Sequence, residues 1–325
     1  MLLDDSAHAA YSCVLCDGPL QDWMSVPSDW RRPEDPRSYE LYWCAACSFG
    51  QVQPRPSHAD VRSFYETEYY THDRHEPEPE RLTFLERIKE HLAWRADRGV
   101  DITAELVHRL VKRKPARICE FGCGSGTLLK ALSDLGHSVV GLEPDPAARQ
   151  VAEERGIQTY PDDAETPSAE LTSGSFDVVI MCHVLEHCLD PLRAIATARR
   201  ALRAGGYLIC ETPNNVALGL RQSGARWPWL DVPRHLNFFT AESLKRISAL
   251  AGLNVTGVEF VGYSRQFDRK WLRDEERICA ALQPSPRSTR TRIALQNWVL
   301  LGRTALERGE RKYDSVRVVA EAASA

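Results

Sequence analysis

Short apolar runs alternate with amphipathic stretches between residues 115 and 262. Apolar runs of strand length occur five times, as RICEFG (117–122), HSVVGLE (137–143), IQTYP (157–161), FDVVIMC (176–182) and GYLICETP (206–213). Three stretches with helical periodicity lie between them, as TLLKALSDLG (127–136), PAARQVAEERG (146–156) and PLRAIATARRAL (191–202). Strands that alternate with such helices form βαβ units around a parallel sheet. We therefore predict an α/β, doubly wound domain over residues 115–262.

The rest of the chain divides into three parts. Residues 1–75 are rich in turns and aromatic side chains and have few long apolar runs, so they need a staple to fold. Residues 76–114 carry apolar positions at helical spacing and predict a helical connector. Residues 263–325 predict a C-terminal helical extension, in which 293–306 forms an amphipathic helix. That helix is expected to pack on the same protein or on a second copy, with weak contact to a membrane surface as the alternative.

Composition and charge argue against a nucleic-acid-binding, a secreted and a membrane-spanning protein. The chain of 325 residues has a formal net charge of −4, which gives no reason to expect a nucleic-acid partner. Its first residues, MLLDDSAHAA, lack the basic start and the long apolar run of a secretory signal, and no run approaches the length of a membrane span. Ten cysteines, four of them in two close pairs, favour a metal site in a reducing compartment over a disulfide framework. We predict a cytoplasmic protein that is a monomer or a homodimer.

A glycine-rich turn, EFGCGSG, follows the first predicted strand. Gly122, Gly124 and Gly126 allow a tight turn and a close approach of a ligand, next to the free N–H groups at the start of a helix. The second strand ends in Glu143, whose carboxylate can accept hydrogen bonds from ribose hydroxyls. A NAD site shares both features. However, Glu120 lies directly before the turn, where it would repel a pyrophosphate but suit a cationic sulfonium with an amino-acid tail.

The run EFGCGSGT resembles motif I of the class I S-adenosylmethionine (SAM) dependent methyltransferases. Further matches follow in the order of that family: Glu143 after the second strand, Asp163-Ala164 after the third, FDVVIMCHVLEH at the fourth and LRAGGYLICETPN at the fifth. The resemblance covers residues 115–260 and implies a Rossmann-like sheet of seven strands with SAM as the cofactor.

The same resemblance implies a role for each matched residue. Glu120 would orient the methionine ammonium of SAM, Glu143 would bind the ribose, and Asp163 would bind the adenine amine. The remaining predicted cofactor contacts are Gly122, Gly124, Gly126 and Cys182.

Histidines follow the fourth strand, at the edge where such sheets bind ligands. His183, Glu186 and His187 have the spacing i, i+3, i+4 and would share a face on one helical turn. His187 is expected either to pack beneath the cofactor loop or, like His183, to act as the general base that deprotonates the acceptor. The third alternative is a divalent metal site at these three residues, since ubiquinone-pathway O-methyltransferases look similar here. Those enzymes have a glutamate where this chain has His183, so the site here would have two imidazole ligands in place of an oxygen-rich set. His235, in the aromatic segment 226–244, is a further candidate base or a structural histidine that anchors the segment.

Two CxxC pairs lie near the N-terminus, Cys13–Cys16 and Cys44–Cys47. Two such pairs can supply four thiolates to a tetrahedral zinc, which would provide the folding free energy that this core-poor segment lacks. Four ligands leave no open position on the ion, so the predicted zinc site is structural, and a redox-active dithiol is the alternative. We therefore expect a small zinc-ribbon-like module at the N-terminus.

This N-terminal run resembles the zinc-binding leader of methyltransferases that modify sugars and other secondary metabolites. In that group the aromatic stretch after the second CxxC pair closes over the acceptor, which implies that Tyr65, Tyr69 and Tyr70 contact the substrate. Packing of these tyrosines on the methyltransferase domain is the alternative.

The expected activity is in-line transfer of the SAM methyl group to a small-molecule or glycan acceptor, as O-methylation with a histidine base. Sugar C-methylation, RNA methylation and non-catalytic SAM binding are the alternatives. Residues 1–59 contain eight acidic and four basic residues, the reverse of the balance that an RNA-binding module requires.

Overall fold

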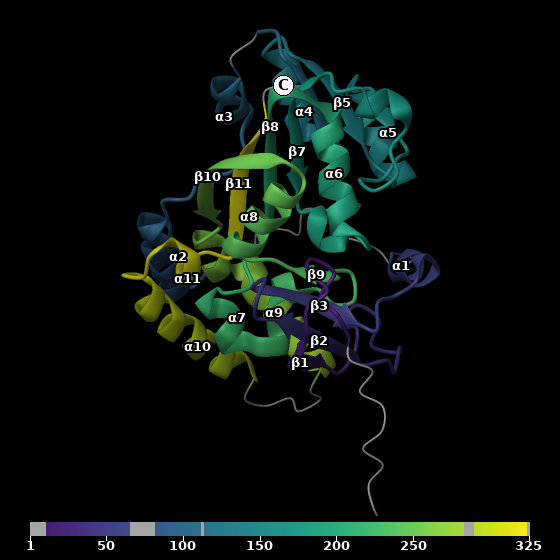
Figure 1. Cartoon of the computed structure of the whole chain (residues 1–325). Helices are drawn as coiled ribbons and strands as arrows, with labels where there is room; N and C mark the ends of the chain where they lie inside the picture. The colour runs from purple at the N-terminus through teal and green to yellow at the C-terminus, as the bar shows by residue number, and fades with distance from the viewer. Residues whose placement is uncertain (1–10, 66–81, 112–113, 283–288, 324–325) are drawn as a thin grey trace, which may run out of the picture.

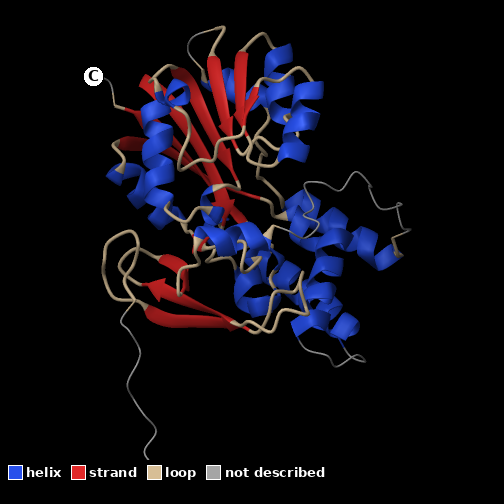
Figure 2. Cartoon of the chain, turned by 90° about the vertical axis from the view of Figure 1, so that its right-hand side faces the viewer, coloured by secondary structure: helices blue, strands red, loops and turns tan. Residues whose placement is uncertain are grey.

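The structure is a computed structural model that describes residues 11–65, 82–111, 114–282 and 289–323. A large mixed sheet with helices on both faces lies at one end of the molecule, and a small antiparallel sheet lies at the other (Figure 1, Figure 2). Within these described ranges, no helix is both long and apolar enough to cross a membrane.

The large sheet has seven strands in the order β10-β11-β8-β7-β4-β5-β6. Its strands are β4 (Arg117–Phe121), β5 (Ser138–Leu142), β6 (Thr159–Tyr160), β7 (Phe176–Cys182), β8 (Leu202–Pro213), β10 (Leu253–Val261) and β11 (Ser315–Ala322). The five strands predicted from the apolar runs are β4 to β8, and they pair in parallel. The strand order reverses between β4 and β7, so the carboxyl ends of these strands form the crevice in which α/β proteins bind ligands. The prediction of a doubly wound, seven-stranded α/β fold is confirmed.

Helices bury both faces of this sheet. Helices α3 (Ala104–Leu110), α4 (Thr127–Asp134) and α5 (Pro146–Glu154) cover one face, and α6 (Pro191–Ala201) and α8 (Ala241–Leu250) cover the other. Successive residues of β7 enter the two cores in turn, because side chains alternate along a strand: Val178 and Ile180 join one core, and Val179 and Met181 the other. A strand that is buried on both faces reads as one apolar run, which is why the sequence predicted β7.

The last strand, β11, was not predicted. Residues 263–325 were expected to be helical, and the structure corrects this for Ser315–Ala322, which inserts antiparallel between β10 and β8. The strand contains Arg317, a residue that pattern reasoning places at the surface. Here Arg317 is fully buried because it donates to the carboxylates of Glu211 at 2.9 Å and Glu259 at 2.8 Å and to the carbonyl of Val100 at 2.7 Å. These partners lie far away in sequence, so the pattern could not reveal them.

The N-terminal part forms a module that we call the cysteine module, residues 11–64. It contains β1 (Gln21–Val26), β2 (Tyr39–Cys44), β3 (Phe49–Gln53) and α1 (His58–Phe64). Its sheet has the order β1-β2-β3-β9, and the fourth strand, β9 (Asn237–Phe238), comes from the aromatic segment 226–244. The module is therefore joined directly to the part of the chain that contains His235.

The remaining helices pack between and beside the two sheets (Figure 1). They are α2 (Phe84–Ala96), α7 (Leu218–Ser223), α9 (Arg269–Leu282), α10 (Thr289–Thr304) and α11 (Gly309–Lys312). Helix α10 corresponds to the amphipathic helix predicted at 293–306. Its Leu300 and Leu301 are buried against Ala93 of α2 and against Tyr263, so its apolar side packs on the same protein. Leu295 and Val299 of the same helix stay exposed.

Candidate active site

The glycine-rich turn lies at the carboxyl end of β4. Gly122, Gly124 and Gly126 all have positive φ values, of 69°, 52° and 71°, a backbone region that side chains with a Cβ rarely adopt. A Cβ at Gly122 would also lie 2.6 Å from Cγ2 of Val184, whereas a Cβ at Gly124 would meet no atom within 4 Å. The turn is therefore packed against the chain at Gly122 and open to a ligand at Gly124.

Two carboxylates face this opening. Glu143 accepts hydrogen bonds from the N–H groups of Gly124 at 2.8 Å and Asp145 at 2.9 Å. Glu120 is buried, and its Oε2 atom has no hydrogen-bond partner among the described residues. Burial, and then repulsion by Glu143, raises the pKa of Glu120 to about 8. A buried carboxylate without a partner favours a cationic ligand, so Glu120 fits the ammonium of SAM.

Two further predicted cofactor residues lie at or after the carboxyl ends of strands of the large sheet. Asp163 follows β6, and its Oδ1 accepts from the N–H groups of Glu165 at 2.9 Å and Thr166 at 2.7 Å, which stabilises its own loop. Cys182 ends β7, and burial followed by the nearby carboxylates of Glu211 and Glu120 raises the pKa of its thiol. The role of Asp163 toward adenine stays a prediction, whereas Cys182 lies close to Glu120 in the same crevice.

His183 lies between two carboxylates. It has a left-handed backbone with φ of 55° and precedes the 3₁₀ turn Leu185–His187, so it is not part of the helical turn that the spacing predicted. Its Nδ1 is 3.0 Å from Oε1 of Glu186, its Nε2 is 3.6 Å from Oε1 of Glu211, and its ring stacks on Trp229 at 4.7 Å. Burial lowers the pKa of His183, but the two carboxylates outweigh it and raise the pKa to about 9. His183 is therefore an imidazolium at neutral pH, without a lone pair to accept a proton.

His187 and His235 form a second, neutral pair. Their ring centroids are 4.6 Å apart. Nδ1 of His187 lies 3.1 Å from the carbonyl of Arg234, and Nδ1 of His235 lies 2.8 Å from the carbonyl of Trp229. A carbonyl only accepts, so Nδ1 of His235 carries the hydrogen and its Nε2 keeps the lone pair. Nδ1 of His187 also lies 2.8 Å from the Tyr65 hydroxyl, which can donate or accept, so both tautomers of His187 fit its contacts. Burial lowers the pKa of both rings, that of His235 to about 4.

Glu186 completes this group. It is fully buried, and its Oε2 atom has no partner among the described residues. One ring nitrogen of His187, one of His235 and one oxygen of Glu186 lie within 4.8 Å of one another. The metal site considered from the sequence used His183 with Glu186 and His187, and the structure instead brings His235 to those two residues. Two imidazoles and one carboxylate are a donor set that suits borderline divalent metal ions.

Tyr65, the residue directly after the cysteine module, also contacts this group. It follows α1, its hydroxyl is 2.8 Å from Nδ1 of His187, and its side chain is 36% exposed. Tyr65 is thus placed where it contacts both a candidate catalytic residue and solvent. The other two predicted substrate contacts, Tyr69 and Tyr70, lie outside the described residues.

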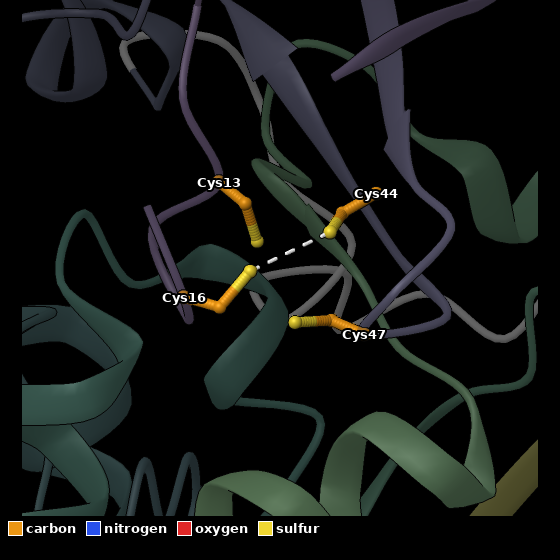
Figure 3. A group of neighbouring side chains, drawn as sticks. All are labelled: Cys13, Cys16, Cys44 and Cys47. Carbon is orange, nitrogen blue, oxygen red and sulfur yellow. Dashed lines mark hydrogen bonds between the residues drawn. The ribbon is translucent and has the colours of Figure 1, made fainter. Parts of the chain in front are cut away.

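The four cysteines of the two CxxC pairs converge on one point (Figure 3). The sulfur atoms of Cys13, Cys16, Cys44 and Cys47 all lie within 4.8 Å of one another. Sγ of Cys16 is 3.7 Å from Sγ of Cys44, far longer than a disulfide bond. Asp17 and Ser48, each directly after a pair, have φ values of 56° and 49°, which turn the chain sharply around the cluster. Four convergent thiols fit a tetrahedral zinc ion.

Several residues at the site were missed from the sequence. Glu211 ends β8 at the ligand-binding edge, and an acid at the end of a parallel strand was the signal that could have identified it. Trp229 lies in the aromatic segment 226–244, but its stacking on His183 depends on the fold. Arg55 carries no local signal, although it contacts the chain next to both neutral histidines.

Comparisons with known proteins agree with this geometry. Residues 94–258, half of the chain, match a family model described as a methyltransferase domain. A ubiquinone biosynthesis O-methyltransferase of Cereibacter sphaeroides is 32% identical over 194 residues, which cover 55% of this chain and 73% of the relative. Another of the same name, from Aeromonas salmonicida, is 34% identical over 168 residues, which cover 46% and 69%.

Among solved structures, a SAM-dependent methyltransferase of Thermotoga maritima, described as a possible histamine N-methyltransferase, has a TM-score of 0.45 at 21% identity and covers 73% of this chain and 93% of its own. The family match, the ubiquinone-pathway relatives and the carboxylate-lined glycine turn together show that the chain belongs to the SAM-dependent methyltransferases.

Proposed function

We propose that this methyltransferase methylates a hydroxyl group of a small-molecule acceptor and that a neutral histidine removes the hydroxyl proton. The observation that carries the proposal is the buried His187–His235 pair, in which both rings are neutral and each therefore keeps one unprotonated nitrogen. His187 lies in the turn after β7, the strand that pairs with β4 and its cofactor turn, and His235 packs against it from the segment 226–244.

The chain's own residues divide the work of binding and proton transfer. SAM supplies an electrophilic methyl group on a sulfonium. Glu120 would hold its ammonium and Glu143 its ribose, while the open backbone at Gly124 leaves room for the ligand. As the bond from the methyl carbon to the acceptor oxygen forms and its bond to sulfur breaks, leaving a neutral thioether, the hydroxyl proton would pass to the unprotonated nitrogen of His187 or His235. Glu186 would stabilise the imidazolium that forms.

His183 has a different part in this proposal. Its two nitrogens already contact Glu186 and Glu211, so it would fix these carboxylates rather than accept the proton. We therefore assign proton removal to His187 or His235 among the three histidines that the sequence suggested.

Two lines support a hydroxyl on a small molecule as the acceptor. The curated relatives are named as O-methyltransferases of ubiquinone biosynthesis. In addition, the exposed Tyr65 beside His187 suits the substrate contact that the sequence suggested for Tyr65, Tyr69 and Tyr70. A glycan hydroxyl fits the same chemistry, whereas sugar C-methylation and RNA methylation remain alternatives that a product analysis distinguishes.

The experiment is incubation with ¹³C-methyl-labelled SAM and fractionated extract of the source cells. We expect label in a small molecule, with the carbon shift of a methoxy group. Label in RNA or on carbon would overturn the proposal. With the purified acceptor, His187→Ala and His235→Ala should lower kcat by about 100-fold or more, the scale of general-base catalysis. His58→Ala, an exposed histidine of α1, is the matched control and should have no effect.

A second candidate follows from the unpartnered Oε2 of Glu186 beside the two histidines. In that mechanism the Glu186, His187 and His235 side chains would hold a divalent metal ion, which would supply Lewis-acid chemistry for deprotonation of the acceptor hydroxyl in place of a histidine base. Metal analysis distinguishes the two. A purified protein with one bound metal ion per chain, lost only on cysteine substitution, supports the histidine base, and a second ion lost in His235→Ala supports the metal mechanism.

We also propose that the four cysteines hold one structural zinc ion, because four ligands leave no position for a substrate. The cytoplasmic location and the monomeric or homodimeric state stay predictions from the sequence.

A further inference from the structure

Arg55 makes an unusual set of contacts. It follows β3 of the cysteine module, and its guanidinium donates to three backbone carbonyls rather than to a carboxylate. Nη1 donates to Leu236 at 2.8 Å, and Nη2 donates to Leu189 at 2.6 Å and Cys188 at 3.2 Å. The side chain thus bridges segments that are more than a hundred residues away from it in sequence.

Two of these carbonyls belong to the residues that directly follow the neutral histidines. Cys188 comes after His187, and Leu236 comes after His235. One rigid guanidinium therefore fixes the backbone next to both rings at once. A lysine could not reproduce this, because its ammonium is a point charge without the planar fork of donors.

The opposite side of the turn after His187 is held by an anion. The carboxylate of Glu165 accepts from the N–H groups of Leu189 at 2.7 Å and Asp190 at 3.1 Å. The turn is therefore clamped between a cation on its carbonyls and a carboxylate on its amides.

The cysteine module supplies the fixed end of the bridge. β3 begins two residues after Cys47, pairs with β9 through Gly50 and Gln51, and donates from the Val52 N–H to the carbonyl of Leu236 at 3.1 Å. Arg55 contacts that same carbonyl. The position of the guanidinium therefore depends on the fold of the four-cysteine module.

We propose that Arg55 is a positioning residue that fixes the segments of His187 and His235 relative to each other and so couples the four-cysteine module to methyl transfer. This inference rests on the proposed role of the histidine pair as the base. Through the contacts of Arg55, the cysteine module would then contribute to catalysis.

The consequence for rate follows from geometry. Without the guanidinium, the carbonyls of Cys188, Leu189 and Leu236 lose their shared donor, and the two segments with the histidines can move relative to each other. A displacement of about 1 Å at a catalytic group costs roughly 100-fold in rate. The cofactor carboxylates Glu120 and Glu143 make no contact with Arg55 among the described hydrogen bonds, so SAM affinity should not change.

The test compares Arg55→Ala and Arg55→Lys with Arg37→Ala in the full-length, metal-loaded protein. Arg37 is the control because it belongs to the same module, but its own side chain is exposed and pairs with Asp35 and with the exposed Asp60. We expect kcat to fall about 100-fold in Arg55→Ala, with unchanged SAM affinity and zinc content, and to recover partly when guanidinium chloride is added at millimolar, non-denaturing concentration. Arg55→Lys should keep the fold but not the rate, and Arg37→Ala should keep both.

A second measurement needs no acceptor and so separates this inference from the proposed function. Nitrogen-15 NMR of the histidine rings should show both His187 and His235 neutral in the wild type, His235 in the Nδ1–H form, with one set of signals for each ring. In Arg55→Lys we expect shifted or doubled signals from both rings. The proposal would be overturned if the ring signals were unchanged in Arg55→Lys. It would also be overturned if guanidinium did not rescue the loss of kcat and SAM affinity fell by an equal factor. If the ring signals change in Arg55→Lys as expected but the protein methylates no hydroxyl group, only the proposed function is refuted.

Discussion

Replacement of Glu120 by glutamine tests the cofactor site with two effects of opposite sign. The substitution keeps the shape of the side chain and removes its charge. In the free protein, Oε2 of Glu120 is buried without a partner, and Glu143 repels its charge. Loss of the charge should therefore stabilise the free protein while it weakens SAM binding.

The pH dependence of the stabilising effect follows from the direction of the pKa shift. The pKa of Glu120 rises from its ordinary value of 4.5 to about 8 in the folded protein. A carboxyl that holds its proton more tightly when folded costs stability as the pH rises between these two values. Wild type should thus lose stability relative to Glu120→Gln from pH 5 to pH 8, and the difference should be largest near and above pH 8. Urea unfolding without SAM, at a series of pH values, measures it.

The binding effect is larger and has the opposite sign. Removal of one partner from a buried, hydrogen-bonded charge pair costs about 2–5 kcal/mol, which is roughly 30-fold to several thousand-fold in the dissociation constant of SAM. Because the ammonium of SAM selects the ionised carboxylate, wild-type affinity should increase with pH up to about 8, and the variant should lack this dependence. Calorimetry at pH 6.5 and pH 8.5 measures both. The control is Glu242→Gln, an exposed glutamate of α8. Unchanged SAM affinity in Glu120→Gln, or a loss of stability in the free variant, would refute the reasoning.

Three other substitutions test separate parts of the structure. Cys47→Ser removes one buried thiol from the four-cysteine cluster, so the zinc content should fall toward zero and the cysteine module should become sensitive to protease. Metal analysis and limited proteolysis measure these effects, and retained zinc would contradict the site. Gly122→Ala combines a positive φ with a Cβ placed 2.6 Å from Val184. Gly124→Ala has only the strain of its positive φ, about 1–2 kcal/mol, because its Cβ would lie in open space. Urea unfolding should therefore show a larger loss of stability for Gly122→Ala. Arg317→Met leaves the buried carboxylate of Glu211 without its arginine and should lower the free energy of unfolding by about 3–5 kcal/mol. Glu259→Gln changes a half-exposed partner of the same arginine and should lower it much less, and equal losses would argue against the buried pair.

Local chemistry explains why some elements were predictable. The strands β4, β5 and β7 are short apolar runs followed by helices that have ordinary start signals, such as Asp145 and Pro146 at α5. The Thr240–Ser243 capping box at α8 is a signal of the same kind. Each of these features is written within a few neighbouring residues. The glycine turn with Glu120 belongs to the same class, and the sequence therefore identified the methyl donor.

The histidines show where local reasoning stops. Spacing alone placed His183, Glu186 and His187 on one helical turn, but the left-handed backbone of His183 turns its ring between Glu186 and Glu211. The pairing of His187 with His235 spans 48 residues and has no sequence signal. The protonation state of a buried imidazole depends on such neighbours, because burial and partner charges act in opposite directions on its pKa.

The sequence by itself determined the α/β class, the order of βαβ units, the cofactor turn and the two cysteine pairs, since each depends on residues that are close together along the chain. Only the tertiary structure decided that β11 joins the sheet, that β9 completes the sheet of the cysteine module, and that Arg55 lies beside both neutral histidines. The physical reason is the same in each case. A buried arginine, a neutral histidine or an added strand is stable only with particular partners, and these partners come from distant parts of the chain.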